Sequence, residues 1–284
     1  MDIIYCLRHS QAGDLEIRYS LRSVARYFPA VGKIWIFGDR PAFLSNDTKL
    51  IEHVPHDYVA GVTGFRTPIT NYFQLLFTSS LIPELSQEYL WFCDDYILLD
   101  ELTPDAAKTV RYLEDLDQVK RRGRGKWLDA LWRTYDILKH LGYSGLNFET
   151  HTPTYCQRKW VFEAYQTFQD YVTQDRWLGM LAPTAILNHA MSKQNFTPVN
   201  VNDENTRIGF WGKSPSYHDV QEATRGKLFM NFDDTAFGDG LRQYLQEHFP
   251  KSCRYESVEE VSSEVGSRNF VPGCFQADAK ASLE

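Results

Sequence analysis

Cysteine and long apolar runs are scarce in this sequence. The 284-residue chain has five cysteines, an odd number, and they stand far apart without any CxxC pair. Neither a disulfide framework nor a thiolate zinc site is therefore expected. No run approaches the roughly 18 apolar residues of a membrane span, and the opening MDIIYCLRHS lacks the basic start and apolar stretch of a signal peptide. We expect a cytoplasmic protein with no membrane span.

An excess of positive charge is also absent. The formal net charge is -7, with 24% charged and 43% hydrophobic residues, which is an ordinary mixture for a soluble globular protein. Proteins that coat nucleic acid depend on neutralising phosphates, so this charge argues against that function for the chain as a whole. It leaves room for a local basic groove. We find no internal repeat and no low-complexity tract.

The most informative stretch is Tyr89 to Leu99, YLWFCDDYILL, where two adjacent carboxylates interrupt a strand-forming apolar run. A continuous apolar run is typical of a strand buried on both faces, as in a parallel sheet. Unpaired carboxylates there would carry several kcal/mol of desolvation cost unless a cation sits between them. Asp94 and Asp95 therefore suggest a hard divalent metal at the carboxyl edge of the sheet. The alternative is a turn in which both face water.

The order of expected elements predicts an α/β fold. Strands alternate with helices as β-α-β-β-α-β over the first hundred residues, for which a mainly parallel central sheet flanked by helices is the natural outcome. Residues 1–155 would form the core, and residues 156–284 a helix-rich part that completes the same domain on its acceptor side. The expected strands are 2–7, 33–38, 50–54, 89–92 and 227–232, and the expected helices are 15–28, 70–81, 128–141, one from about 160, 176–191 and 236–248.

Several polar residues at expected strand and helix ends are candidates for binding an anionic ligand. Free backbone N–H groups at a helix start, together with a cationic side chain, favour a phosphate. A glycine-rich loop, 59–68, precedes the 70–81 helix, and a basic loop, VKRRGRGKW, covers 119–127; either loop can also be an ordinary solvated connection. The candidates are Arg8, Asp39, Arg66, Asn71 and Lys126.

His151 lies in a loop, FETHTP, between a strand-like piece and a helical pattern. A lone loop histidine is more often a structural residue than a ligand. If it approaches the carboxylate pair, a neutral imidazole would suit Mn²⁺ better than Ca²⁺. A second acidic pair, Asp233 and Asp234, precedes the last helix and is interpreted as its N-cap.

Two stretches together resemble the Stealth family of sugar-phosphate transferases and the phage-encoded glycosyltransferase-type proteins that share its regions. LEIRYSLRSVARYFPAVGKIWIFGD, residues 15–39, is similar to the family's second region, and IPELSQEYLWFCDDYILL, residues 82–99, to its third. His151-Thr152-Pro153 is similar to its His-x-Pro segment. The resemblance covers the first 160 residues, and Arg18 and Arg22 match the family's arginines.

The resemblance implies a GT-A-like nucleotide-sugar fold with a helical C-terminal extension, in which the acidic pair acts as the DxD-type metal motif. Asp95 would be the principal ligand of Mn²⁺ or Mg²⁺, Asp94 its neighbour on metal or donor, and His151 a further ligand or a phosphate contact. The family's asparagine before the pair is Cys93 here, and its first region is replaced by the shorter 3–10. Glycosyl transfer is therefore expected rather than sugar-phosphate transfer.

Three functions compete. The first is a metal-dependent glycosyltransferase moving a sugar from a nucleotide-sugar donor to a hydroxyl of a carbohydrate or surface polymer. The second is a phage-type enzyme, in the host cytoplasm, that glycosylates a hydroxymethylated base in DNA. The third is a non-catalytic nucleotide- or sugar-binding module. Asp39, Asp203 and Asp233 are unranked candidates for a catalytic base, and the sequence leaves the sugar, nucleotide, stereochemistry and oligomeric state open.

Overall fold

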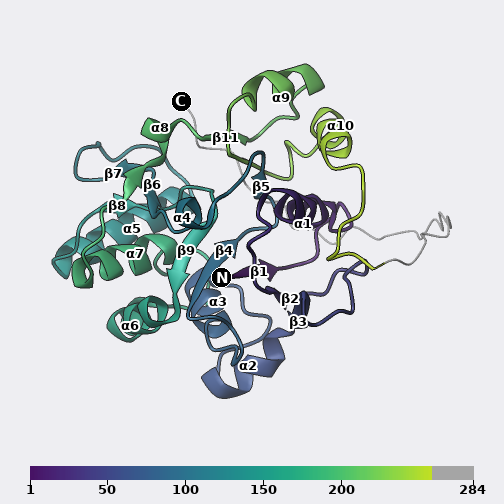
Figure 1. Ribbon diagram of the computed structural model, residues 1–284. Coiled ribbons are helices and arrows are strands. Elements are labelled where there is room, and N and C mark those ends of the chain that lie inside the picture. The colour runs from purple at the N-terminus through teal and green to yellow at the C-terminus, as the bar shows by residue number, and fades with distance from the viewer. Residues whose placement is uncertain (258–284) are drawn as a thin grey trace, which may run out of the picture.

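The computed structural model describes residues 1–257, and its centre is a five-stranded sheet in the order β3-β2-β1-β4-β9 (Figure 1). The strands β1, β2, β3 and β4 are parallel, and β9 joins the edge antiparallel to β4. They span β1 Asp2–Leu7, β2 Ile34–Gly38, β3 Ile51–Val54, β4 Glu88–Phe92 and β9 Thr154–Gln157. The expected α/β architecture with a mainly parallel sheet is thus confirmed.

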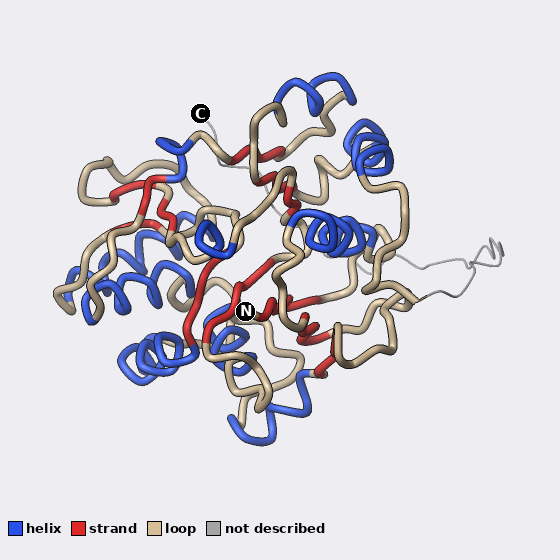
Figure 2. Tube along the Cα trace, in the orientation of Figure 1, coloured by secondary structure: helices blue, strands red, loops and turns tan. Residues whose placement is uncertain are grey.

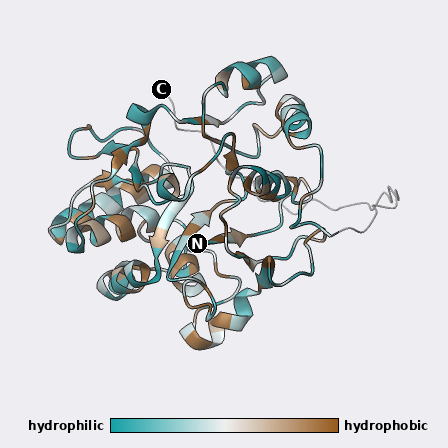
Figure 3. Cartoon of the chain, viewed as in Figure 1, coloured by the Kyte–Doolittle hydropathy of each residue, from teal (hydrophilic) through white to brown (hydrophobic). Residues whose placement is uncertain are grey.

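Helices cover both faces of this sheet. Successive side chains of β1 point to opposite faces, and each face contacts a helix. On one face the Tyr5 hydroxyl is 2.8 Å from the Ser20 hydroxyl of α1 (Leu15–Tyr27). On the other face Cys6 meets Ser79 of α3 (Tyr72–Ser79). Figure 3 shows the resulting hydrophobic centre around β1, β2 and β4. Both faces are buried, which explains why these strands read as continuous apolar runs.

The later part of the chain forms helices and short strands beside the central sheet (Figure 1 and Figure 2). A second sheet, β11-β12-β5, joins β5 from the first half to strands from the second. The remaining elements are α2 His56–Thr63, β5 Ile97–Leu98, α4 Pro104–Ala107, β6 Arg111–Tyr112, β7 Glu114–Asp115, α5 Lys126–His140, β8 Leu146–Asn147, α6 Arg158–Phe168, the 3-10 helix Gln169–Tyr171, α7 Ala182–Lys193, β10 Val199–Asn200, α8 Val201–Glu204, β11 Arg207–Phe210, α9 Tyr217–Ala223, β12 Phe229–Phe232 and α10 Asp239–His248.

The structure departs from the sequence-based elements in two places. Part of the expected loop 59–68 is helical, because α2 extends to Thr63 before Gly64 ends it in the left-handed conformation. The expected helix 176–191 begins only at Ala182, which is followed by Pro183 at a favourable position in the first turn. The residues just before it form a polar turn in which Asp175 accepts hydrogen bonds from the amides of Trp177 and Leu178.

Two aspartates that stand before helices do not cap them with their side chains, although Asp233 was predicted to do so. Asp14 precedes α1 but does not cap it, because its carboxylate is occupied by His9 Nδ1 and the Ser10 amide. Asp233 accepts from the amides of Gly212 and Ala236, whereas α10 begins later, after Gly238. No helix within residues 1–257 is long and apolar enough to cross a membrane. The last part of the range 156–284, from residue 258, lies outside the described residues.

Candidate functional site

Asp94 and Asp95 lie immediately beyond the carboxyl end of β4, separated from it only by Cys93. The neighbouring strand β1 is followed by the polar loop that begins at Arg8. The strand order reverses between β1 and β4, since β2 and β3 lie on one side of β1 and β4 on the other. Ligands of open α/β sheets bind in the crevice at such a reversal. The acidic pair therefore occupies the place where the fold itself favours a ligand.

Both carboxyl groups are held in surroundings that disfavour two negative charges. Burial, together with the nearby Glu16 and Asp234 carboxylates, raises the pKa of Asp94 to about 7. Burial also raises the pKa of Asp95 well above its usual range, with Asp94 as the next cause. Two half-buried carboxyl groups side by side thus retain a proton near neutrality, unless a cation stabilises their charged forms.

The side chain of Asn231, on β12, lies beside Asp95. Its side chain is fully buried, and neither its amide oxygen nor its amide nitrogen makes a hydrogen bond of standard geometry within residues 1–257. The amide lies close enough to Asp95 to oppose the rise in the pKa of that residue. A buried polar group without a partner is costly and calls for an explanation. Asn231 thus favours the ionised form of Asp95, and two adjacent carboxylates suit Mg²⁺ or Mn²⁺.

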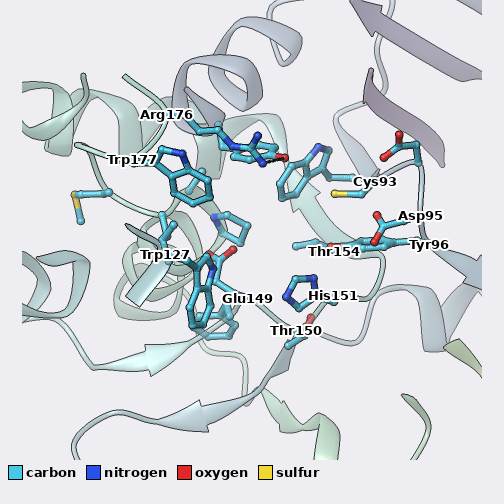
Figure 4. Close-up of a pocket in the computed structure, with 18 residues that line it drawn as sticks. Cys93, Asp95, Tyr96, Trp127, Glu149, Thr150, His151, Thr154, Arg176 and Trp177 are labelled. Carbon is cyan, nitrogen blue, oxygen red and sulfur yellow. Dashed lines mark hydrogen bonds between the residues drawn. The ribbon is translucent and has the colours of Figure 1, made fainter. Parts of the chain in front are cut away.

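The pair opens onto a cavity of about 210 Å³ between β4, the segment before β9 and the start of α7 (Figure 4). In Figure 4, Asp95 and Tyr96 lie at one end, Trp127 and Trp177 at the other, and Glu149 and His151 along the side between them. The lining residues are Tyr72, Trp91, Cys93, Asp94, Asp95, Tyr96, Trp127, Phe148, Glu149, Thr150, His151, Thr154, Arg176, Trp177, Met180, Leu181, Ala182 and Pro183.

His151 reaches this cavity together with the acidic pair, although the three are far apart in sequence. Its backbone is left-handed, with φ 53°, and its ring meets that of Trp211 edge-on at 5.8 Å. Burial, followed by the charge of Arg207, lowers the pKa of His151 to about 4, so the imidazole is neutral near pH 7. Within residues 1–257, no three His, Cys, Asp or Glu side chains are grouped to hold one ion. His151 therefore does not complete a three-ligand set with the two carboxylates.

The other predicted residues lie around the cavity rather than in it. Arg8, Arg66 and Lys126 are exposed. Asp39 follows β2 and accepts a hydrogen bond from the His9 amide at 2.8 Å. Asn71 is buried, caps α3 through the amides of Phe73 and Gln74, and donates to the Asp175 carbonyl. Its side chain thus holds the start of α3, while Arg8 and Asp39 lie at the carboxyl edge of the sheet near the pair.

Sequence reasoning missed Glu149. Its Oε1 atom accepts hydrogen bonds from both the backbone N–H and the hydroxyl of Thr184, in the first turn of α7, at 3.2 and 3.0 Å. Burial raises the pKa of Glu149 to about 7, against the opposing effect of those two bonds. An acidic residue two positions before His151, at the end of a strand-like piece, was the only sequence signal for it.

The aromatic end of the cavity was also missed. Arg176 donates to the Tyr72 hydroxyl at 3.3 Å and lies over the rings of Tyr72 and Trp177, at 5.1 and 4.8 Å from their centroids. Trp127 at the start of α5 faces the same space (Figure 4). Flat aromatic faces next to a cationic, hydrogen-bonding group form a surface on which a ring with hydroxyl groups can lie.

Comparison with known proteins gives a limited result. No protein-family model matches the chain, and no curated protein matches it. Two solved structures of galactosyltransferase LgtC are similar to it at 13% identity over 89% of this chain and 98% of theirs: one in complex with donor and acceptor sugar analogs, with a TM-score of 0.47, and one of an active-site mutant, with 0.46. Likeness at this level does not assign an activity to the chain.

Proposed function

We propose that this protein is a metal-dependent glycosyltransferase that moves a sugar from a nucleotide-sugar donor to a hydroxyl of a carbohydrate acceptor. The observation that carries the proposal is the position of Asp94 and Asp95, at the carboxyl end of β4 where the strand order reverses, at the mouth of an aromatic-lined cavity. A GT-A-like fold, implied by the sequence resemblance, agrees with this placement. That this protein is of the Stealth type or of the phage-encoded type remains a prediction from the sequence resemblance.

The residues that would hold Mn²⁺ or Mg²⁺ are Asp94 and Asp95, because they are adjacent and no cationic side chain is among the causes that shift their pKa values. When bound, such an ion supplies Lewis-acid stabilisation of a leaving diphosphate. Mg²⁺ is commonly bound by one or two carboxylates together with substrate phosphates, so a small protein donor set suits this function.

Residues on one side of Asp94 and Asp95 would bind the donor, and residues on the other side would bind the acceptor. Arg8 and Asp39, at the carboxyl ends of β1 and β2, lie where the donor nucleotide would bind in a sheet of this topology. Arg8 would contact the phosphates and Asp39 a sugar hydroxyl. His151, as a neutral imidazole, would donate or accept one hydrogen bond to the bound donor. Trp127, Trp177 and the other aromatic residues would exclude water and hold the acceptor ring.

The test is a thermal-shift screen of UDP, GDP, CMP and TDP sugars, each with and without Mn²⁺. We expect one nucleotide class to raise the unfolding midpoint only with metal, and Asp95→Ala to abolish the rise. Removing a carboxyl group whose pKa burial raises should not destabilise the ligand-free protein at neutral pH. Asp100→Ala, which removes an exposed carboxylate from the same segment, is the matched control and should keep the shift.

A wild type that no nucleotide sugar stabilises under any metal condition would contradict the proposal. A shift that persists in Asp95→Ala would place the nucleotide elsewhere. A metal-dependent shift without any turnover, over a broad acceptor panel, would favour the binding-module alternative.

A further inference from the structure

We propose that Glu149 is the general base of the transfer and accepts the proton of the attacking acceptor hydroxyl. This inference rests on the proposed function and assigns a role that the sequence left open. It starts from geometry: Glu149 lines the same cavity as Asp94 and Asp95 but comes from a separate segment, the loop between β8 and β9. Figure 4 shows its side chain beside the cavity between Trp127 and His151.

The carboxylate is anchored through one oxygen only. Both hydrogen bonds from Thr184, that of the backbone N–H and that of the hydroxyl, end on Oε1. No described residue donates to Oε2 in a bond of standard geometry, although the group is half-buried. One oxygen fixed by a helix and the other left for a ligand is the arrangement that positions a base, because the orientation is set before substrate binds.

The three acidic residues that the sequence offered as a base do not line the cavity. Asp233 uses both of its oxygens on the Gly212 and Ala236 amides, and Asp39 holds the His9 amide on the donor side. Asp203, on α8, is exposed. Asp94 and Asp95 are assigned to the metal. Among the acidic residues that line the cavity, Glu149 is therefore the one that is not assigned to the metal.

The nearby imidazole is a weaker candidate. Burial and Arg207 lower the pKa of His151 to about 4, so this ring would hold a transferred proton poorly. Burial raises the pKa of Glu149 to about 7, which makes it the stronger base of the two while leaving it largely ionised above neutral pH.

The step balances as a single displacement. The acceptor oxygen forms a bond to the anomeric carbon as the bond from that carbon to the diphosphate oxygen breaks. The electron pair of the broken bond leaves with the nucleoside diphosphate, and the acceptor proton moves to Oε2 of Glu149, which later releases it to water. Because the acceptor oxygen attacks the anomeric carbon from the face opposite the leaving diphosphate, the product has inverted configuration.

Glu149→Gln is the sharpest test, since the amide oxygen can still accept from Thr184 and keep α7 in place. Donor binding is measured by thermal shift, using the nucleotide sugar with the largest effect on the wild type plus Mn²⁺. Transfer is measured as nucleoside diphosphate released in the presence of a panel of methyl glycosides. We expect the shift to remain and transfer to fall about 100-fold or more, as for loss of a general base. Glu101→Gln, on an exposed loop, should transfer like the wild type.

A second variant separates chemistry from structure. Glu149→Ala opens space beside Thr184, and added formate should restore a measurable part of its transfer rate, whereas Glu149→Gln should not respond. The anomeric configuration of the product, read by NMR, should be inverted.

The inference is overturned if Glu149→Gln transfers within about three-fold of the wild type, if the product retains configuration, or if the variant loses donor binding as well. In those cases Glu149 only anchors α7, while the proposed function stands on the wild-type metal-dependent shift. Absence of that shift in the wild type would remove both.

Discussion

Burial shifts the pKa values of ionisable side chains that line the cavity. It raises the pKa of carboxyl groups and lowers the pKa of an imidazole. The carboxyl groups of Asp94 and Glu149 have pKa values raised to about 7, and the imidazole of His151 has a pKa lowered to about 4. In each case burial disfavours the charged form. Groups with shifted pKa values cluster where a protein binds or transforms a ligand, because acids, bases and nucleophiles need pKa values matched to their task.

The raised pKa of Glu149 makes the free energy of unfolding depend on pH. Its folded-state pKa, about 7, lies above its ordinary value of 4.5. The native state thus binds this proton more tightly, and the resulting stabilisation is present below pH 4.5 and lost as the pH rises through 7. We expect Glu149→Gln to remove this loss and to be more stable than the wild type at pH 8.5 by about 2 kcal/mol.

Urea unfolding with EDTA, at pH 5 and pH 8.5, measures that difference without bound metal. Glu101→Gln should follow the wild type at both values. Equal pH slopes for the wild type and Glu149→Gln would show that the Glu149 carboxyl group is not perturbed.

Among the secondary-structure elements, α1 is connected to the end of the described chain through the buried carboxylate of Glu256. Arg22 donates to both oxygens of Glu256, at 2.7 and 2.8 Å, and to the Phe249 carbonyl at 2.9 Å. Arg18 is 3.4 Å from the same carboxylate. The arginines that match the resembled family thus have a structural partner in this chain: Glu256, which is 7% exposed.

We expect Arg22→Ala to lower the free energy of unfolding by about 3 kcal/mol, because it leaves the Glu256 carboxylate buried with a weakened counter-charge. Arg26→Ala is a control on the same helix, where the arginine is exposed, donates to the His248 carbonyl and lies over the Tyr27 ring. It should change the value by less than about 1 kcal/mol. Urea unfolding of both variants, with Glu256→Gln to close a double-mutant cycle, gives the coupling. Additive effects would contradict the role of this contact.

For the whole molecule, the charge distribution bears on the DNA alternative. The basic loop 119–127 is partly neutralised within the fold, since Arg121 pairs with Asp136 and Arg122 pairs with Glu114 at 2.7 Å. The formal net charge of the chain is -7. The positive charge that remains on this loop is smaller than the positive charge with which DNA-binding proteins contact phosphates.

We expect no binding to duplex DNA, with or without hydroxymethylated bases, at about 0.15 M salt, near physiological ionic strength. Fluorescence anisotropy over a salt series measures this. An affinity that falls steeply and linearly with the logarithm of salt concentration would instead support the DNA-modifying alternative, and Arg124→Ala should then reduce the slope.

Local patterns were sufficient for the central strands β1 to β4 and for the helices α1 and α3. The strand Asp2–Leu7 was predicted from a short run of β-forming residues, and the helix that begins at Leu15 from apolar residues at helical spacing, because both signals depend on residues only a few positions apart. The place of Asp94 and Asp95 at the carboxyl edge of a parallel sheet followed from the same reasoning. Helix starts that depend on polar turns, such as that of α7, were missed.

Only tertiary structure decided which side chains share the cavity. Glu149 depends on Thr184 in another helix, and Asn231 reaches Asp95 from a strand more than a hundred residues away. No periodicity links such positions, since their contact results from the packing of whole elements against the sheet. The sequence by itself determined where a ligand site would open; the packing of β12 and α7 against that opening determined which groups would act in it.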